Sequence, residues 1–205
     1  MAKTKTEMFT LIGNNLPDNT SGAITPEKLR EVTTQLADSM LYSAAGVKEV
    51  ELLRSSSTAT QAPAAVDTAY QVIFGSASGS SSNPVMLSAA GLLTFNAPGS
   101  YAVRLKLQLG RTGGTGTSII FSRVLLNGAA FGSPSVARIE NANQIFATES
   151  RVTINVAAGA TLSLQIIRDS AGANSGGLVP LTPTTFTAWG AAPSALLVVS
   201  RLEPV

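Results

Sequence analysis

The chain has 205 residues, 44% of them hydrophobic, so it can bury the core of one full domain and carry an attached segment. It contains no Cys and no His, which excludes disulfides, thiolate or imidazole metal ligands, Cys nucleophiles and His-based acid-base catalysis. A net charge of +2, scattered Lys and Arg residues and 5% aromatic residues argue against a nucleic-acid-binding surface, and the apolar runs are far shorter than the roughly 20 residues of a membrane helix.

Charge density divides the chain into two parts. Half of the charged side chains lie in the first 57 residues, and the Ser- and Thr-rich run that follows Arg54 is typical of a linker. We therefore expect an N-terminal segment over residues 1–54, a linker over 55–67 and a β domain over 68–205.

The N-terminal segment is expected to be irregular at first and then helical. Turn-forming residues from Asn14 to Gly22 predict an extended stretch, and Thr25, Pro26 and Glu27 make a good helix start, which predicts a helix over about residues 26–42. Its apolar residues share one face; they are Leu29, Val32, Leu36 and Met40. An isolated helix of this length is marginal in water, so the stripe needs a cover: further copies of the helix, a groove on another protein, or the chain's own β domain.

The second part consists of short predicted strands. Apolar residues alternate with polar ones over residues 103–109 and 152–156. Further strands are expected at residues 70–74, 92–95, 119–126, 145–148, 162–167, 186–189 and 196–202, and turn formers separate them at 96–99, 127–128, 158–159 and 172–177. Many short strands without a helix between them predict a mainly β fold, an antiparallel β-sandwich or jelly roll.

Two of these strands are apolar on both faces, whereas the outer face of an antiparallel sheet normally meets water. The residues concerned are Ile119, Phe121, Val124, Leu126, Leu196, Leu197, Val198 and Val199. We expect identical subunits to cover them, which places them at the interface of a homo-oligomer. The alternative is that loops of the same chain cover them.

Signals for catalysis are weak. The Gly-rich stretch 110–116 lies between two predicted strands, so it favours a hairpin loop over a phosphate cradle, which needs a following helix. A glycosidase pair formed by Glu140 and Glu149 is conceivable, but solvated or ion-paired surface groups are the simpler interpretation. Trp189, the sole Trp, fits a core or interface position better than a platform for a sugar. We expect no enzyme, no metal and no cofactor.

The N-terminal segment carries a motif. Residues Leu16–Pro26, followed by Leu29–Val32 and Ala37–Met40, resemble a leader found at the start of many phage virion proteins, including tail-fibre and head-fibre proteins. In such proteins the leader is thought to attach the appendage to the particle. The resemblance implies a virion-anchoring role for Asn14, Asn15, Leu16, Pro17, Asp18, Asn19, Ile24, Leu29, Val32, Leu36 and Met40.

The β domain carries a second resemblance. Its segments Phe95–Tyr101 and Val156–Leu162 and its apolar final strand, Ala195–Leu202, are similar to the trimeric jelly rolls of the tumour-necrosis-factor and complement globular-head superfamily. This resemblance implies a tight three-fold assembly.

Together these features predict a structural component of a bacteriophage virion, made in the host cytoplasm: a homotrimeric head fibre or capsid decoration protein. Its expected partners are copies of itself and phage capsid or tail proteins, with no nucleic acid and no insertion into a membrane. The alternative is a short tail fibre or receptor-binding protein that adheres to host surface polysaccharide. In that alternative the surface loops that contact the ligand hold Arg111, Thr112, Thr115, Asn174 and Ser175.

Overall fold

A computed structural model describes residues 47–113, 116–171 and 175–204. The predicted helix over 26–42 and the predicted anchoring residues, Asn14 to Met40, lie outside the described residues. Within the ranges just given, no helical segment has the length and apolar character of a membrane span. Residues Glu49–Leu202 form one compact unit.

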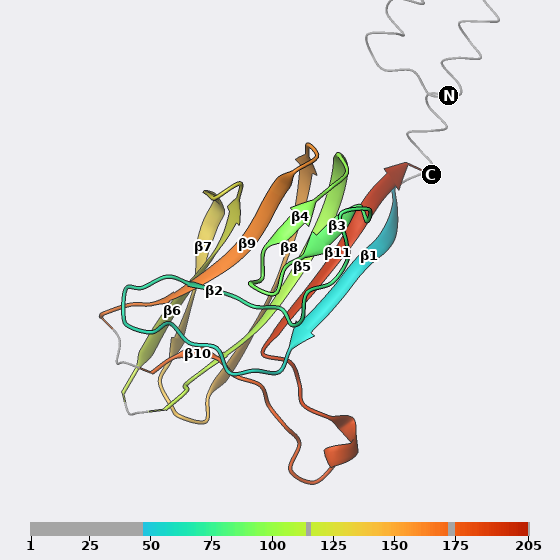
Figure 1. Cartoon of the computed structure of the whole chain (residues 1–205). Coiled ribbons are helices and arrows are strands. Elements are labelled where there is room, and N and C mark those ends of the chain that lie inside the picture. Colours follow the sequence, from blue (N-terminus) through green and yellow to red (C-terminus); the bar gives the residue numbers. More distant parts are fainter. Residues whose placement is uncertain (1–46, 114–115, 172–174, 205) are drawn as a thin grey trace, which may run out of the picture. The chain divides into compact units, whose positions relative to one another are not determined.

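Two antiparallel sheets make up this unit (Figure 1). Sheet A has the order β1 (Val47–Ser57), β11 (Ala195–Pro204), β5 (Gly99–Gly110) and β8 (Ile145–Val156), with the short β10 (Gly177–Leu178) on the same edge of β5 as β11. Sheet B has the order β3 (Val85–Leu87), β4 (Leu93–Phe95), β9 (Ala160–Arg168), β6 (Ser118–Leu126) and β7 (Ala129–Ile139), with β2 (Tyr70–Gln71) beside β4 on the edge of β9.

The strand pairs are nested along the sequence. The first strand, β1, pairs with the last, β11; inside that pair lie β4 with β9, then β5 with β8, and β6 with β7. A long hairpin folded over on itself gives this order, which is that of a jelly roll. The predicted fold class, a mainly β antiparallel sandwich, is therefore confirmed.

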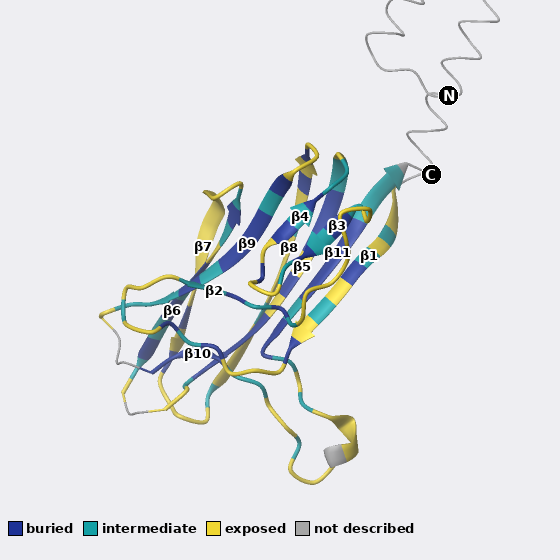
Figure 2. Ribbon diagram, in the orientation of Figure 1, coloured by how far each residue is buried: buried dark blue, intermediate teal, exposed yellow. Residues whose placement is uncertain are grey.

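The core lies between the two sheets, and alternation decides which residues enter it. On β5, every second residue from Tyr101 to Leu109 is buried, and Arg104 and Lys106 point outward. Among the largest fully buried side chains are Tyr101 and Phe95, whose ring centroids are 4.8 Å apart. Figure 2 shows the buried residues concentrated where the sheets face each other and exposed residues along β7 and β8.

Two sequence-based boundaries need correction. Residues Val47–Ser57 form β1, so the sandwich begins before the predicted linker and takes in the end of the predicted N-terminal segment. The expected strand over 186–189 is instead a single 3-10 turn, η1 (Thr187–Trp189). That stretch has Phe and Trp, which favour strands, but no neighbouring strand offers it a ladder, and Gly190 follows with a φ of +71°.

Candidate binding surfaces

The residues predicted to form a trimer interface do not share one surface. Leu197 and Val199 lie in the chain's own core, and Val124 and Leu126 pack against that core. Ile119 and Phe121 are half-buried on the outer face of sheet B, whereas the outward residues of β11, Leu196 and Val198, belong to sheet A. A single subunit therefore explains much of the apolar character of these strands without any neighbour.

The outer face of β11 is covered by ion pairs of the same chain. Glu49 on β1 pairs with Arg104 on β5, with 3.1 Å between the carboxylate and the guanidinium, and also with Arg151 on β8. Because β11 lies between β1 and β5, the link from Glu49 to Arg104 crosses the outer face of β11, where Val198 is the register partner of Arg104. Val198 is only 6% exposed. The inference that a neighbouring subunit must cover this strand is wrong for Val198, because its own chain covers it.

The opposite edge of the sandwich is open. There β7 ends sheet B and β8 ends sheet A, and several large apolar side chains remain exposed. They are Phe131 (38% exposed), Val136 (56%), Ile145 (37%) and Phe146 (45%). Between the two sheets at this edge runs a cleft of about 160 Å³, lined by core residues such as Leu105 and Leu164 and by Phe131. We call these two strands and their cleft the open edge.

The predicted ligand loops do come together at one end of the sandwich. Arg111, in the β5–β6 loop, donates a hydrogen bond from Nε to the hydroxyl of Ser175, in the β9–β10 loop, at 3.3 Å. Thr112 is exposed, but Ser175 is 8% exposed, so its side chain offers little surface. Thr115 and Asn174 lie outside the described residues. The proximity of these loops is established, and their role in binding stays a prediction.

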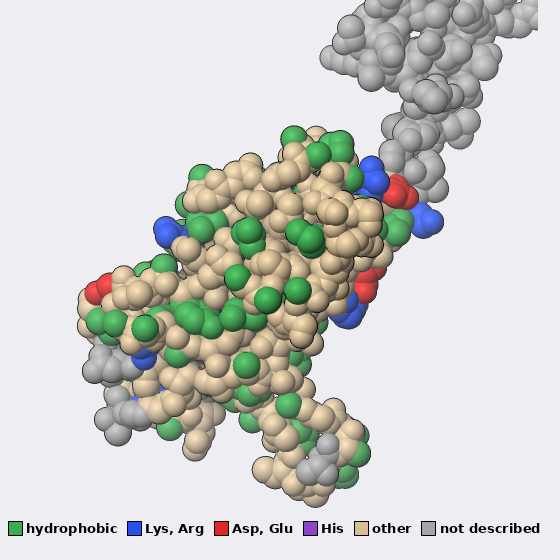
Figure 3. Space-filling model, in the orientation of Figure 1, with side chains coloured by type: hydrophobic (Ala, Val, Ile, Leu, Met, Phe, Trp, Pro, Cys, Tyr) green, Lys and Arg blue, Asp and Glu red, His purple; other side chains and the backbone are tan. Residues whose placement is uncertain are grey.

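A third loop at this end, within which the sequence predicted a strand over 186–189, is more prominent. Residues 180–193, here called the aromatic loop, stand away from the body of the sandwich (Figure 3). Trp189 is 82% exposed and Phe186 64% exposed, and their rings stack with centroids 5.6 Å apart and planes at 25°. Together with Leu181 and two prolines they line an open depression of about 760 Å³. Trp189 is therefore not a core residue, and the interface position that the sequence also allowed stays a prediction.

Hydrogen bonds fix both ends of the aromatic loop. On one side, the amide of Val179 donates to the carbonyl of Gln108, whose side-chain amide donates back to the Val179 carbonyl at 2.7 Å. On the other, the hydroxyl of Ser194 donates to the Ala59 carbonyl at 2.6 Å. Within the loop, Leu181 and Ala192 form a two-way backbone bridge. The loop is thus tied to β5 and to the chain just after β1.

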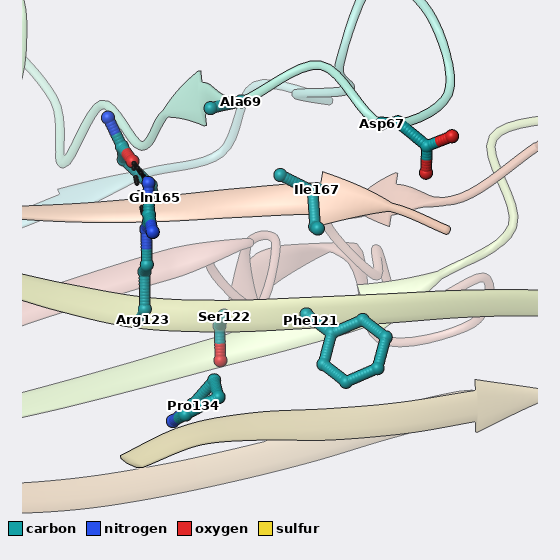
Figure 4. Close-up of a pocket in the computed structure, with 8 residues that line it drawn as sticks. All are labelled: Asp67, Ala69, Phe121, Ser122, Arg123, Pro134, Gln165 and Ile167. Atoms are coloured by element: carbon teal, nitrogen blue, oxygen red, sulfur yellow. Dashed lines mark hydrogen bonds between the residues drawn. The ribbon is translucent and has the colours of Figure 1, made fainter. Parts of the chain in front are cut away.

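The outer face of sheet B carries a shallow groove (Figure 4). It has a volume of about 340 Å³ and an apolar floor formed by Phe121 and Ile167, with Pro134 at one side. At one end Arg123 donates two hydrogen bonds to the side-chain oxygen of Gln165, at 3.0 and 3.2 Å.

Several described charged groups form ion pairs at the surface. Glu140, one member of the conceivable glycosidase pair, forms an exposed ion pair with Arg138 at 3.2 Å. Glu51 accepts a hydrogen bond from Arg54, and this bond lowers the pKa of the carboxyl group. Across the described ranges, no three acidic residues gather as a metal site would require.

Comparison with known proteins leaves the family open. No protein-family model and no curated protein matches the sequence. Among solved structures, the chain is similar to the Eiger TNF protein from S. frugiperda, with 13% sequence identity and a TM-score of 0.42 over 78% of this chain and 92% of that chain. At this level of similarity the description of the fold rests on the strand pairing alone.

Proposed function

We propose that this chain is a structural component of a bacteriophage virion, a homotrimeric head fibre or capsid decoration protein attached through its N-terminal segment. The observation that carries the assembly part of this proposal is the open edge. The phage assignment rests on the leader resemblance of residues 16–40, and the number three rests on the resemblance of the β domain to trimeric jelly rolls.

The open edge calls for a partner on physical grounds. An uncovered edge strand bearing apolar side chains is an aggregation hazard, which proteins normally cover or charge. Here β7 is blunted against strand addition, because its pairing with β6 is interrupted near Ser122 and Pro134 removes a backbone donor. Contact through side chains is therefore favoured over a continuous intermolecular sheet. A ring of identical subunits, each placing its open edge on a neighbour, closes such contacts without leaving a free end.

A second candidate function is a short tail fibre or receptor-binding protein. The aromatic loop favours it, because an exposed and ordered apolar platform is typical of an interaction site. Both candidates share the same trimeric sandwich and the same anchoring segment. They differ in where the protein sits on the particle and in whether the aromatic loop meets host material.

Electron microscopy of particles separates the two candidates and tests the anchor. A tag inserted at the exposed Ala89–Ala90 turn, away from the open edge, is expected to label the head if the protein is a decoration, and the tail tip if it is an adhesin. Deletion of residues 1–40 is expected to abolish incorporation while the sandwich still folds. Unchanged incorporation of the deleted protein, or absence of the full-length protein from purified particles, contradicts the proposal.

A further inference from the structure

We propose that the aromatic loop binds an uncharged polysaccharide, with a sugar ring stacked on the indole of Trp189. The inference rests on the second candidate above, adhesion to surface glycan. It assigns that role to residues 180–193 instead of to the loops around Arg111 and Ser175.

Exposure is the first argument. An indole at 82% exposure leaves nearly all of its apolar surface in water, and Trp is the side chain that gains most from being covered. Phe186 stacks against it, with ring centroids 5.6 Å apart and planes at 25°, which supports the indole and adds a second exposed ring to the apolar surface. The pyranose ring presents a matching flat face of C–H groups, so stacking removes apolar area on both partners.

The second argument is that the loop is built in advance of binding. Its two ends are held by hydrogen bonds at Val179 and Ser194, its neck by the Leu181–Ala192 bridge, and its tip by the bond from the Trp189 amide to the Phe186 carbonyl at 3.0 Å. Pro183 and Pro193 restrict the backbone further. An ordered platform loses little conformational freedom when a ligand arrives.

The third argument is the chemistry of the rim. No Asp, Glu, Lys or Arg occurs between Asp169 and Arg201, so the loop has no charge to pair with a nucleic acid, an acidic polysaccharide or an anionic membrane. Helices and loops that bind anionic membrane surfaces typically carry Lys or Arg beside the apolar residues. Exposed Thr182 and Thr184 line the same depression as the rings, and their hydroxyls both donate and accept, as the hydroxyls of a neutral sugar require.

Position is the fourth argument. In sheet A, β1 runs toward the loop and β11 runs away from it, since the Ser194 amide bonds the Ser57 carbonyl. Glu49 and Leu202, where the chain enters and leaves the sandwich, therefore lie at the end opposite the aromatic loop (Figure 1). The points at which the chain enters and leaves the sandwich therefore do not obstruct the aromatic loop.

Because Trp189 is the sole Trp, its fluorescence reports on the loop alone. Full-length protein is titrated with dextran, laminarin, mannan and galactomannan, with hyaluronan as the acidic comparison and with phosphatidylcholine vesicles, plain or containing phosphatidylglycerol. We expect at least one neutral polysaccharide to shift the emission to shorter wavelength, and hyaluronan and both vesicles to leave it unchanged.

Variants are compared by affinity electrophoresis in gels that contain the active polysaccharide. Trp189→Ala is expected to weaken retention about tenfold or more, since aromatic stacking and the apolar area it buries together exceed the 1.4 kcal/mol that corresponds to a factor of ten. Trp189→Phe recovers part of the retention, and Phe186→Ala weakens it while keeping the fluorescent reporter. Leu92→Ala, a matched loss of an exposed apolar side chain in the β3–β4 turn, is expected to bind as the unaltered protein does.

Three results overturn the inference: no neutral polysaccharide shifts the emission, vesicles shift it, or the emission is already that of a buried indole and moves to longer wavelength on dilution. The last result means that a second copy of the chain covers the loop. Sedimentation of the same samples keeps this test separate from the proposed function, because a trimer without glycan binding refutes only the inference and a monomer that binds glycan refutes only the assembly.

Discussion

Tyr101 shows how single residues set the stability of this sandwich. Its ring is fully buried against Phe95, and its hydroxyl donates a hydrogen bond to the Ala97 carbonyl at 2.8 Å. Burial raises the pKa of the Tyr101 hydroxyl above its usual value, because the charged phenolate is poorly solvated in the core. The sequence predicted the strand that carries this residue, but the hydrogen-bond partner depends on the path of the preceding turn.

The raised pKa of Tyr101 has a defined effect on stability. Tyr101 ionises near pH 10 in the unfolded chain and at a higher pH in the folded one. Its contribution to the free energy of unfolding is therefore complete below about pH 10 and is lost as the pH rises through the pKa of the folded state. Tyr101→Phe is expected to lower the unfolding free energy at pH 7 by about 1 kcal/mol, because the hydrogen bond is lost. Between pH 9.5 and 11, the unfolding free energy of the variant is expected to fall less than that of the unaltered protein. Urea titrations across this range measure both effects. Parallel declines for the two proteins contradict the assignment.

A pair of glycines separates backbone strain from steric clash. Gly91 and Gly159 have nearly the same φ, +80° and +84°, but a Cβ at Gly91 would collide with the Val72 carbonyl while a Cβ at Gly159 would meet nothing within 4 Å. Gly159→Ala is expected to cost about 1 kcal/mol from the strained φ alone. Gly91→Ala is expected to cost roughly 1–3 kcal/mol beyond that, because the backbone of the β3–β4 turn or of Val72 must move. Equal midpoints in urea would show that the Val72 contact imposes no cost.

At the scale of elements, alternation and apolar runs between turn formers were sufficient for most strands, and they failed where neighbouring segments decide the structure. The strands over 103–109, 119–126 and 162–167 are confirmed by β5, β6 and β9. By contrast, β1 resembles a charged segment in sequence because its outward residues, such as Glu49, meet arginines that are distant in the chain. The cover over Val198 and the exposure of Trp189 likewise depend on packing between distant segments, which hydrophobic periodicity does not encode.

The open edge yields a prediction about assembly. Phe146, on β8, is 45% exposed in a single subunit, and a charge placed there would have to be buried if a neighbour covers it. Phe146→Glu is expected to raise the dissociation constant of the oligomer at least about tenfold and to change the unfolding free energy of the subunit by less than about 1 kcal/mol. Sedimentation equilibrium and urea unfolding measure the two quantities.

Leu92→Glu is the matched control for this substitution. Leu92 is also a partly exposed apolar residue, at 36%, but it lies in a turn of sheet B away from the open edge. We expect it to leave the mass of the assembly unchanged. If Phe146→Glu and Leu92→Glu assemble equally well, the interface lies elsewhere on the molecule.

At the scale of the whole molecule, the sandwich exposes large apolar side chains in two separate regions. The open edge, formed by β7 and β8, presents apolar side chains along one side, and the aromatic loop presents Phe186 and Trp189 at one end. The outer face of sheet A carries charged side chains that pair within the same chain, since Glu49 binds both Arg104 and Arg151. We propose the open edge as the surface for identical subunits and the aromatic loop as the surface for an external partner.

Sedimentation velocity of the full-length protein at low micromolar concentration tests the central claim, that copies of the chain cover one another's open edges. The account predicts a single species with three times the 21.0 kDa mass of the chain, stable to dilution and to moderate salt because the contact is mainly apolar. A well-behaved monomer over the same concentration range would contradict it.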